Sequence, residues 1–139
     1  MTSRVQGLAL VNGQASGPLL ILDEPISFWG GVDPSSGEII DRLHPQCGHS
    51  IRGTILLLPG TRGSTAGPGA LLETLFNANG PSGVLLAQDD LVTLIGSTLI
   101  QSLQKTPPPV VKLTAQPPEF FITGTHYQIN DAWIQKLTN

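Results

Sequence analysis

The sequence predicts a single mixed α/β domain over residues 1–139, in which parallel strand–helix units combine with antiparallel ribbons. Two successive patterns indicate the parallel part: an apolar run at residues 54–58 precedes a helical pattern at 70–79, and a run at 83–87 precedes another at 91–103. Shorter apolar runs near both ends of the chain indicate antiparallel strands. This length is typical of one domain with one main core.

The chain opens with two partly alternating apolar runs, at residues 4–11 and 14–22. Asn12 and Gly13 separate these runs, and this dipeptide is the strongest short signal for a tight hairpin turn. We therefore expect the two runs to pair with each other as an antiparallel hairpin.

Residues 23–49 show no apolar periodicity and contain three prolines and four glycines, which predicts a long loop. Within it, Phe28 and Trp29 adjoin a pair of glycines at 30 and 31. Two interpretations are open. The aromatic residues can anchor a surface loop in the core, or the loop can form a pocket wall or an interface, because paired glycines let another backbone approach closely.

The middle of the chain predicts two helices. Residues 70–79 form the first, which ends before a Gly-Pro pair. Asp89 and Asp90 can cap the second, whose leucine and isoleucine residues recur with helical spacing. The preceding apolar runs lack alternation, as is typical of strands covered on both faces. The remaining expected elements are strands at 110–113, 120–122 and 126–129 and a helical turn at 132–137.

The charge pattern excludes several classes of partner. Seven basic and ten acidic residues are scattered along the chain and give a net charge of −3, so we expect no binding to nucleic acid or to a membrane surface. The longest apolar segment, residues 91–103, is shorter than the roughly 18 residues of a membrane span. Cys47 has no disulfide partner and the N-terminus lacks a signal-peptide pattern, so we expect a cytoplasmic protein. Only 12% of the residues are charged, which favours a surface partly covered by a partner.

His44, Cys47 and His49 lie close together in sequence and resemble a metal-ligand cluster. A closed zinc site takes four ligands, and no second group of cysteines or histidines is available. An iron–sulfur cluster takes three or four thiolates, and the chain has one cysteine. We expect no metal site in this chain, so an iron–sulfur cluster used with it must be held by another chain.

The segment TRGSTAGPG, residues 61–69, is the strongest candidate for a functional site. It lies between an expected buried strand and an expected helix, where unpaired backbone N–H groups can bind an anion. The segment lacks the lysine of a nucleotide-binding P-loop and the G-x-S-x-G frame of a nucleophile elbow. Two interpretations remain: a connector in which Ser64 or Thr65 caps the helix, or an anion-binding turn that uses the Arg62 guanidinium and both hydroxyls.

Two stretches together resemble a known family: LDEPISFWGGVDPSSGEIIDRLHPQCG, followed by GTILLLPGTRGSTAGPGALLE. The chain resembles the small subunit, or swivel domain, of the aconitase X family in its combination of SFWGGVDP, IIDRLHP and RGS. The resemblance is strongest over residues 13–103. It implies a swivelling β/β/α domain that docks on a larger subunit bearing an iron–sulfur cluster, and a heterodimer that acts as a lyase of the hydro-lyase class.

The resemblance also implies roles for individual residues. Ser64 would be the catalytic base that removes the proton alpha to the carboxylate of a small substrate. Its neighbours Arg62, Gly63 and Thr65 would bind that substrate. A helix N-terminus supplies at most roughly 2 kcal/mol and one pKa unit takes about 1.4 kcal/mol, so the turn alone lowers the pKa of a serine hydroxyl by only a unit or two, which is too little to ionise it. We therefore expect the isolated chain to be inactive. The residues expected at the junction with the large subunit, or directly behind it, are Phe28, Trp29, Gly30, Gly31, Asp33 and His44.

Members of this family dehydrate cis-3-hydroxy-L-proline or mevalonate 5-phosphate. They often continue RGS with further serines, whereas this chain continues with TAGPG. The missing hydroxyls argue against a phosphate-bearing substrate, so the resemblance favours the small subunit of a cis-3-hydroxy-L-proline dehydratase. The alternatives are the small subunit of a mevalonate 5-phosphate dehydratase and a non-catalytic anion-binding or scaffolding module.

Overall fold

The computed structural model describes residues 3–63 and 65–137, and within them eight strands form one sheet in the order β1-β8-β7-β3-β4-β5-β6-β2. The strands are β1 (Arg4–Gln6), β2 (Leu8–Val11), β3 (Gln14–Ile21), β4 (Ile55–Leu58), β5 (Gly83–Leu86), β6 (Val110–Lys112), β7 (His126–Asn130) and β8 (Trp133–Lys136). The helices are α1 (Phe28–Gly31), α2 (Gly67–Phe76), α3 (Leu91–Leu99) and the 3-10 helix η1 (Ile100–Leu103).

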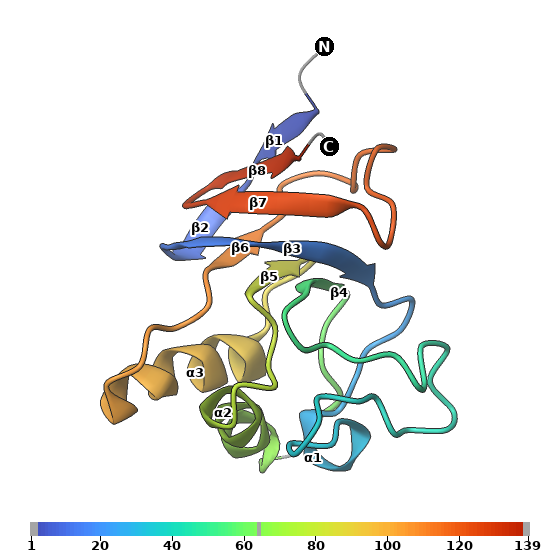
Figure 1. Cartoon of the computed structure of the whole chain (residues 1–139), viewed down its shortest axis with the longest axis vertical. Coiled ribbons are helices and arrows are strands. Elements are labelled where there is room, and N and C mark those ends of the chain that lie inside the picture. Colours follow the sequence, from blue (N-terminus) through green and yellow to red (C-terminus); the bar gives the residue numbers. More distant parts are fainter. Residues whose placement is uncertain (1–2, 64, 138–139) are drawn as a thin grey trace.

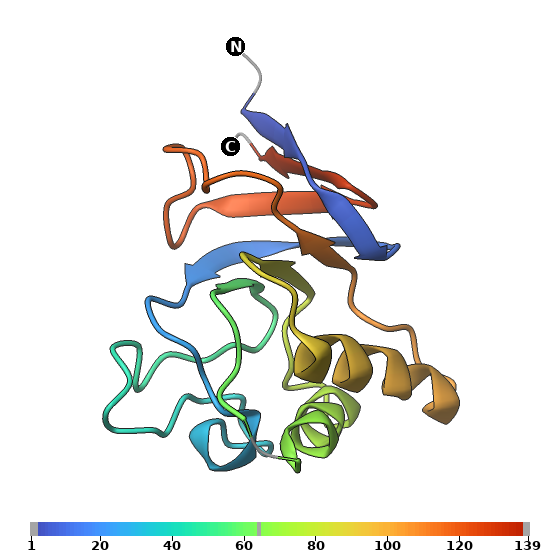
Figure 2. The ribbon, with the colours of Figure 1, turned by 180° about the vertical axis from the view of Figure 1, so that it is seen from behind.

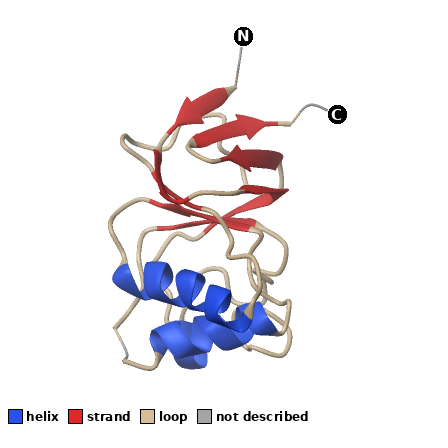
Figure 3. Cartoon of the chain, turned by 90° about the vertical axis from the view of Figure 1, so that its left-hand side faces the viewer, coloured by secondary structure: helices blue, strands red, loops and turns tan. Residues whose placement is uncertain are grey.

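The fold has three layers (Figure 1). Strands β3 to β6 run parallel in the middle, helices α2 and α3 cover one face, and the antiparallel strands β7, β8 and β1 lie on the other side. Figure 3 shows the strands and the helices as separate halves of the molecule. The predicted mixed α/β class is therefore confirmed.

The sheet curls so that its two edge strands are consecutive in the chain. β1 pairs with β8 and β2 pairs with β6, yet only Gly7 separates β1 from β2. A Cβ atom at Gly7 would lie 2.6 Å from the carbonyl oxygen of Lys112, so this crossing requires a glycine. Figure 2 shows the two strands as one segment that crosses the side of the sheet.

The central strands supply two hydrophobic cores, one on each face of the sheet, so the expectation of one main core is wrong. Leu56 and Leu58 of β4 belong to the core that includes Leu71 of α2. Ile55 and Leu57 belong to the core shared with β7 and β8. All four β4 residues are buried, because successive side chains of a strand point to opposite faces. The run without alternation therefore forms a strand covered on both faces, as predicted.

The expected hairpin at Asn12 and Gly13 is wrong. β2 pairs with β6, whereas β3 pairs with β7 and β4, so the two N-terminal strands have different partners. The turn instead meets the turn between β7 and β8: Gly13 donates its N–H to Asp131 Oδ1 (3.0 Å), and Asp131 donates its N–H to the Gly13 carbonyl (2.8 Å). Pairing with strands late in the chain overrides the local turn signal.

The C-terminal segment also differs from the expectation. Residues 132–137 contain β8, which pairs with β7 and β1, so the expected helical turn is wrong. Ile134 is buried and its neighbours Trp133 and Gln135 are exposed, a period of two that fits a strand. The expected strand at 120–122 is instead an irregular segment that buries Phe121.

The two predicted helices are confirmed. α2 begins at Gly67, three residues earlier than expected, with a proline in its first turn. α3 has Asp90 as its N-cap, whose carboxylate accepts a hydrogen bond from the Val92 N–H (3.2 Å). No helix of the described residues has the length and apolar character needed to cross a membrane.

Candidate functional site

The carboxyl ends of the parallel strands β3, β4 and β5 meet at one edge of the sheet, a common place for ligands in α/β folds. The segment after β4 continues beside the segment after β3: Arg62 donates its N–H to the Ile26 carbonyl (2.9 Å), and Ile26 donates its N–H to the Gly60 carbonyl (3.3 Å). The segment at 61–69 therefore leaves the sheet at this edge and leads into α2.

A side-chain hydrogen bond ties this segment to the next loop. Thr61 donates its hydroxyl proton to Asp90 Oδ1 (2.9 Å), and Asp90 Oδ2 accepts from the Thr93 hydroxyl (2.8 Å). Asp90 therefore caps α3 and also fixes the loop after β4. The sequence predicts the first role but not the second, because a contact between neighbouring loops has no local pattern.

Arg62 is held by an ion pair across this edge. Its Nη2 lies 3.0 Å from Glu24 Oε1, and the two side chains are 51% and 48% exposed. An exposed pair of this kind contributes about 0–1 kcal/mol to stability, so its main effect is to orient the guanidinium. The contact uses one of the five guanidinium N–H donors, which leaves others able to bind a ligand carboxylate.

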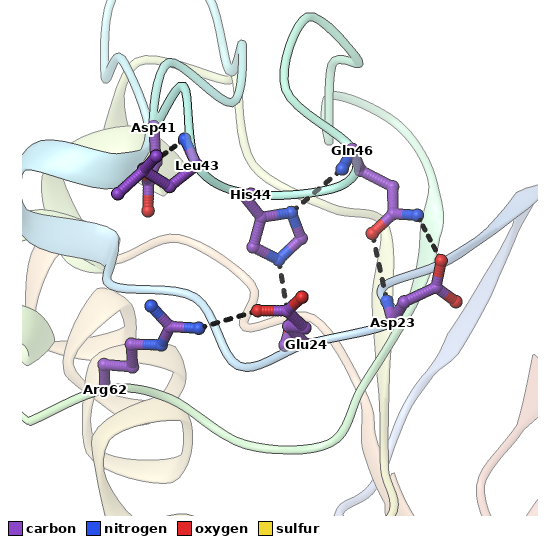
Figure 4. A network of polar contacts seen from close by, with 7 residues as sticks. All are labelled: Asp23, Glu24, Asp41, Leu43, His44, Gln46 and Arg62. Carbon is purple, nitrogen blue, oxygen red and sulfur yellow. Dashed lines mark hydrogen bonds and ion pairs between the residues drawn. The ribbon is translucent and has the colours of Figure 1, made fainter.

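Glu24 is in turn fixed by the loop at residues 41–46 (Figure 4). The Glu24 carbonyl accepts a hydrogen bond from His44 Nε2 (2.9 Å), and His44 Nδ1 accepts one from the Gln46 N–H (3.0 Å). The second bond requires an unprotonated Nδ1, so the neutral ring carries its proton on Nε2. Gln46 also binds Asp23 through both ends of its side-chain amide. His44 is thus a buried residue that holds the main chain of Glu24 in place.

Ser64 lies outside the described residues, whereas its neighbours Gly63 and Thr65 are described and exposed. The N-cap of α2 is Ala66, so Thr65 does not cap the helix. The first turn of α2 contains no acidic side chain that would neutralise the partial positive charge of the helix N-terminus. The turn is therefore able to attract an anion.

A cavity of about 610 Å³ lies beside this turn, between α1 and the first turns of α2. Thr65 lines it on one side, and Trp29 and Gly30 line it on the other. Its charged lining residues are Asp33 and Glu73, and no described basic side chain lines it. The cavity therefore combines apolar walls with negative charge.

The two carboxylates of the cavity differ in their partners. Asp33 accepts hydrogen bonds from the hydroxyl (2.7 Å) and the N–H (2.9 Å) of Ser35, and these bonds hold the pKa of Asp33 below its usual value. The exposed Glu73 side chain makes no hydrogen bond or ion pair within the described part of the chain. Glu73 is thus the carboxylate that is available to a ligand.

The residues expected at the junction with a large subunit fall into two groups in the structure. Trp29 is 63% exposed, and Gly30 has a φ of 83° with open space where a Cβ atom would lie, so both can contact a partner. Asp33 is partly exposed and lines the cavity with them, so it belongs to the same group. Phe28, Gly31 and His44 are buried and can act only through their neighbours.

Among residues 3–63 and 65–137, no three His, Cys, Asp or Glu side chains are grouped as they would be around a metal ion. Both ring nitrogens of His44 are occupied by hydrogen bonds, and Cys47 is exposed on the surface loop. The neighbouring histidines and cysteine of HPQCGH therefore do not form a metal-binding group in the fold.

The family model described as aconitase X swivel domain matches residues 4–136 of the chain. The chain belongs to the aconitase X swivel domain family. The solved structure of aconitase X from Thermococcus kodakaraensis, in its holo form, has a TM-score of 0.84 to this chain at 25% identity. The match covers 97% of this chain and 98% of that one, so the three-layer arrangement is that of the aconitase X swivel fold.

Two kinds of dehydratase are similar to the chain. The cis-3-hydroxy-L-proline dehydratases of Hypocrea jecorina and Pseudomonas aeruginosa are 34% and 44% identical over 135 and 94 residues, or 97% and 68% of this chain. The phosphomevalonate dehydratase small subunit of Methanothermobacter thermautotrophicus is 39% identical over 87 residues, or 63% of this chain. The chain spans 23% and 16% of the two hydroxyproline dehydratases and 66% of that small subunit.

Proposed function

We propose that the chain is the small subunit of a two-chain hydro-lyase of the aconitase X type, inactive without its large subunit. The observation that carries this proposal is the family match over residues 4–136, which includes the Arg-Gly-Ser segment at the edge of the parallel sheet. Relatives that are named small subunits support a larger partner. One cysteine cannot hold an iron–sulfur cluster, so the cluster expected for the family belongs on that partner.

In the proposed reaction Ser64 removes the proton alpha to the substrate carboxylate. The electron pair of the broken C–H bond forms a carbon–carbon double bond as the hydroxyl leaves, and the proton and the hydroxide together make one water. Arg62, Gly63 and Thr65 bind the carboxylate, with Arg62 oriented by Glu24. The alkoxide of Ser64 needs more stabilisation than the roughly 2 kcal/mol that a helix N-terminus supplies. A subunit junction that excludes water would strengthen the charge interactions of the alkoxide.

The charges of the cavity favour cis-3-hydroxy-L-proline as the substrate. This substrate carries an ammonium besides its carboxylate, whereas mevalonate 5-phosphate carries a phosphate. Asp33 and Glu73 line the cavity and no described basic side chain does, an arrangement that attracts an ammonium and repels a phosphate. Mevalonate 5-phosphate is the alternative substrate, because a small subunit of that enzyme is 39% identical over 87 residues.

Reconstitution of the chain with its large subunit and assay of both substrates test the proposal. Ser64→Ala should lower turnover on the order of 1,000-fold or more, without changing the affinity between the subunits. Ser16→Ala, at an exposed serine of β3, is the matched control and should keep wild-type turnover. Retained turnover in Ser64→Ala would contradict the role of Ser64 as the catalytic base. A wild-type pair that dehydrates neither substrate would favour a non-catalytic module.

A further inference from the structure

Helix α3 and the 3-10 helix η1 present an apolar surface to solvent. Residues 91–104 contain no charged residue. Figure 3, viewed from the side on which α3 lies, shows no strand or other helix in front of it. Four large side chains recur along the exposed side at about one-turn intervals, and we call them the α3 stripe: Leu91 (70% exposed), Ile95 (44%), Leu99 (39%) and Leu103 (44%).

The small residues of α3 face inward and so determine which side is exposed. Thr93, Gly96 and Ser97 are buried. Gly96 permits a close approach of α2, because a Cβ atom there would lie 2.9 Å from Leu71 Cδ2 and 3.0 Å from the Pro68 carbonyl oxygen. Rotating the helix to bury the leucines would lose this contact. α3 therefore buries small residues and exposes large apolar ones, the reverse of a usual amphipathic helix. An exposed apolar patch of this kind is typical of a protein-binding surface.

We propose that the α3 stripe is a docking surface for the large subunit, a proposal that rests on the proposed function. The stripe begins at the candidate site: Leu91 follows Asp90, whose carboxylate accepts the hydroxyl proton of Thr61 in the loop that carries the Arg-Gly-Ser segment. A partner that closes the site therefore also reaches the first residue of the stripe.

Two observations favour the large subunit over a second copy of the chain. Four partly exposed side chains offer on the order of a few hundred Å², less than the roughly 800 Å² per partner of a stable interface, so the stripe is one part of a wider contact. In relatives the same fold is 23% or 16% of a longer chain, or is named a small subunit, so a larger polypeptide accompanies it. Because the stripe carries no charge, the surface that covers it must be apolar.

The test is the affinity of the full chain for the aconitase X large subunit of the same organism, measured by isothermal titration calorimetry. Ile95→Glu places a charge within the stripe and should weaken binding about 100-fold or more. Ile122→Glu, at an isoleucine that is exposed in the segment between β6 and β7, is the matched control and should change it less than about twofold. In the wild-type chain, binding should also slow hydrogen exchange of the amides at 91–103, a measurement that needs no variant.

Each outcome decides a separate point. Wild-type affinity of Ile95→Glu, with unchanged exchange at residues 91–103, would overturn the α3 stripe as a docking surface and leave the proposed function standing. A concentration-dependent dimer of the chain alone that Ile95→Glu dissociates would overturn the choice of partner. A wild-type chain that does not bind the large subunit would overturn both proposals.

Discussion

Glu24 Oε1 accepts a hydrogen bond from Arg62 Nη2 at 3.0 Å, and this contact joins the loop after β3 to the loop after β4. Both partners are also held at the main chain, because His44 donates to the Glu24 carbonyl and Arg62 donates to the Ile26 carbonyl. The guanidinium is therefore held in a preset position beside the loop after β3. An arginine that is ordered beforehand loses less conformational entropy when it binds a carboxylate.

Removing the Glu24 carboxylate should weaken substrate binding more than it weakens the fold. In the reconstituted enzyme, Glu24→Ala should raise KM up to about fivefold, about 1 kcal/mol, because the guanidinium loses its fixed orientation and an exposed ion pair contributes no more than this. Glu24→Gln keeps a hydrogen-bond acceptor and should raise KM less. The free energy of unfolding should change by less than about 1 kcal/mol, as for other exposed ion pairs.

Steady-state kinetics and urea unfolding measure these two quantities. Glu38→Gln, at an exposed glutamate outside the candidate site, is the control and should match the wild type in both. An unchanged KM in Glu24→Ala would show that substrate binding by Arg62 does not depend on its ion pair with Glu24.

The central strands and the helices could be predicted because they depend on local sequence. Residues 54–58 are apolar without alternation, and the structure buries the strand within this run on both faces. The pairing partners of a strand cannot be predicted from such a local pattern. Asn12 and Gly13 have the sequence of a hairpin turn, but β2 and β3 pair with strands late in the chain. The segment at 132–137 is too short for its period of two to be distinguished from a helical turn.

The candidate site could be predicted only in part. The flanking patterns place the Arg-Gly-Ser segment between a strand and a helix. The contacts that fix it, Glu24 with Arg62 and Thr61 with Asp90, join residues 38 and 29 positions apart, so no spacing rule reveals them. The orientation of α3 is equally hidden, because it depends on the close approach that Gly96 permits.

Gly96 should not tolerate a side chain, although alanine favours helices. A Cβ atom there would lie 2.9 Å from Leu71 Cδ2 and 3.0 Å from the backbone oxygen of Pro68. Overpacking costs about 1–3 kcal/mol, more than the roughly 1 kcal/mol that alanine gains over glycine in a helix. Gly96→Ala should therefore lower the free energy of unfolding, measured in urea, by up to about 2 kcal/mol.

Gly69→Ala is the matched control on α2, since a Cβ atom at Gly69 would have no neighbour within 4 Å. It should leave the free energy of unfolding unchanged or raise it by up to about 1 kcal/mol. If Gly96→Ala stabilised the chain as Gly69→Ala does, the close packing of α2 on α3 would be contradicted.

Stability at high pH should depend on Tyr127. This residue is buried, its hydroxyl donates to the Phe120 carbonyl, and burial raises the pKa of the hydroxyl. The unfolded chain loses the tyrosine proton near pH 10, whereas the folded chain holds it to a higher pH. The stabilisation is therefore complete below about pH 10 and is lost as the pH rises through the pKa of the folded state.

Tyr127→Phe isolates this effect, because the chain has one tyrosine. The variant should be about 0.5–1.5 kcal/mol less stable near neutral pH, since it lacks the hydrogen bond, and its stability should fall less steeply than that of the wild type above about pH 10. Urea unfolding across this range measures the difference, and phenolate absorbance follows the titration directly. Parallel stability curves for the two proteins would contradict the assignment.

Glu73 should influence which of the two substrates is preferred. Its carboxylate lines the cavity beside Thr65 and has no partner among the described residues, so it is free to pair with the ammonium of cis-3-hydroxy-L-proline. Glu73→Gln should raise KM for this substrate up to about fivefold, because an exposed ion pair contributes about 0.2–1 kcal/mol. KM for mevalonate 5-phosphate should stay the same or fall, because a negative charge near the phosphate is removed.

The ratio of the two KM values is the measurement that matters for Glu73, because a general distortion of the site would raise both. Glu38→Gln again controls for the loss of a negative charge elsewhere on the surface. High salt should reduce the difference between Glu73→Gln and the wild type, since ions screen an exposed pair. An equal rise in KM for both substrates would show that Glu73 does not bind the ammonium of cis-3-hydroxy-L-proline. The charges of the cavity would then not support a preference between the two substrates.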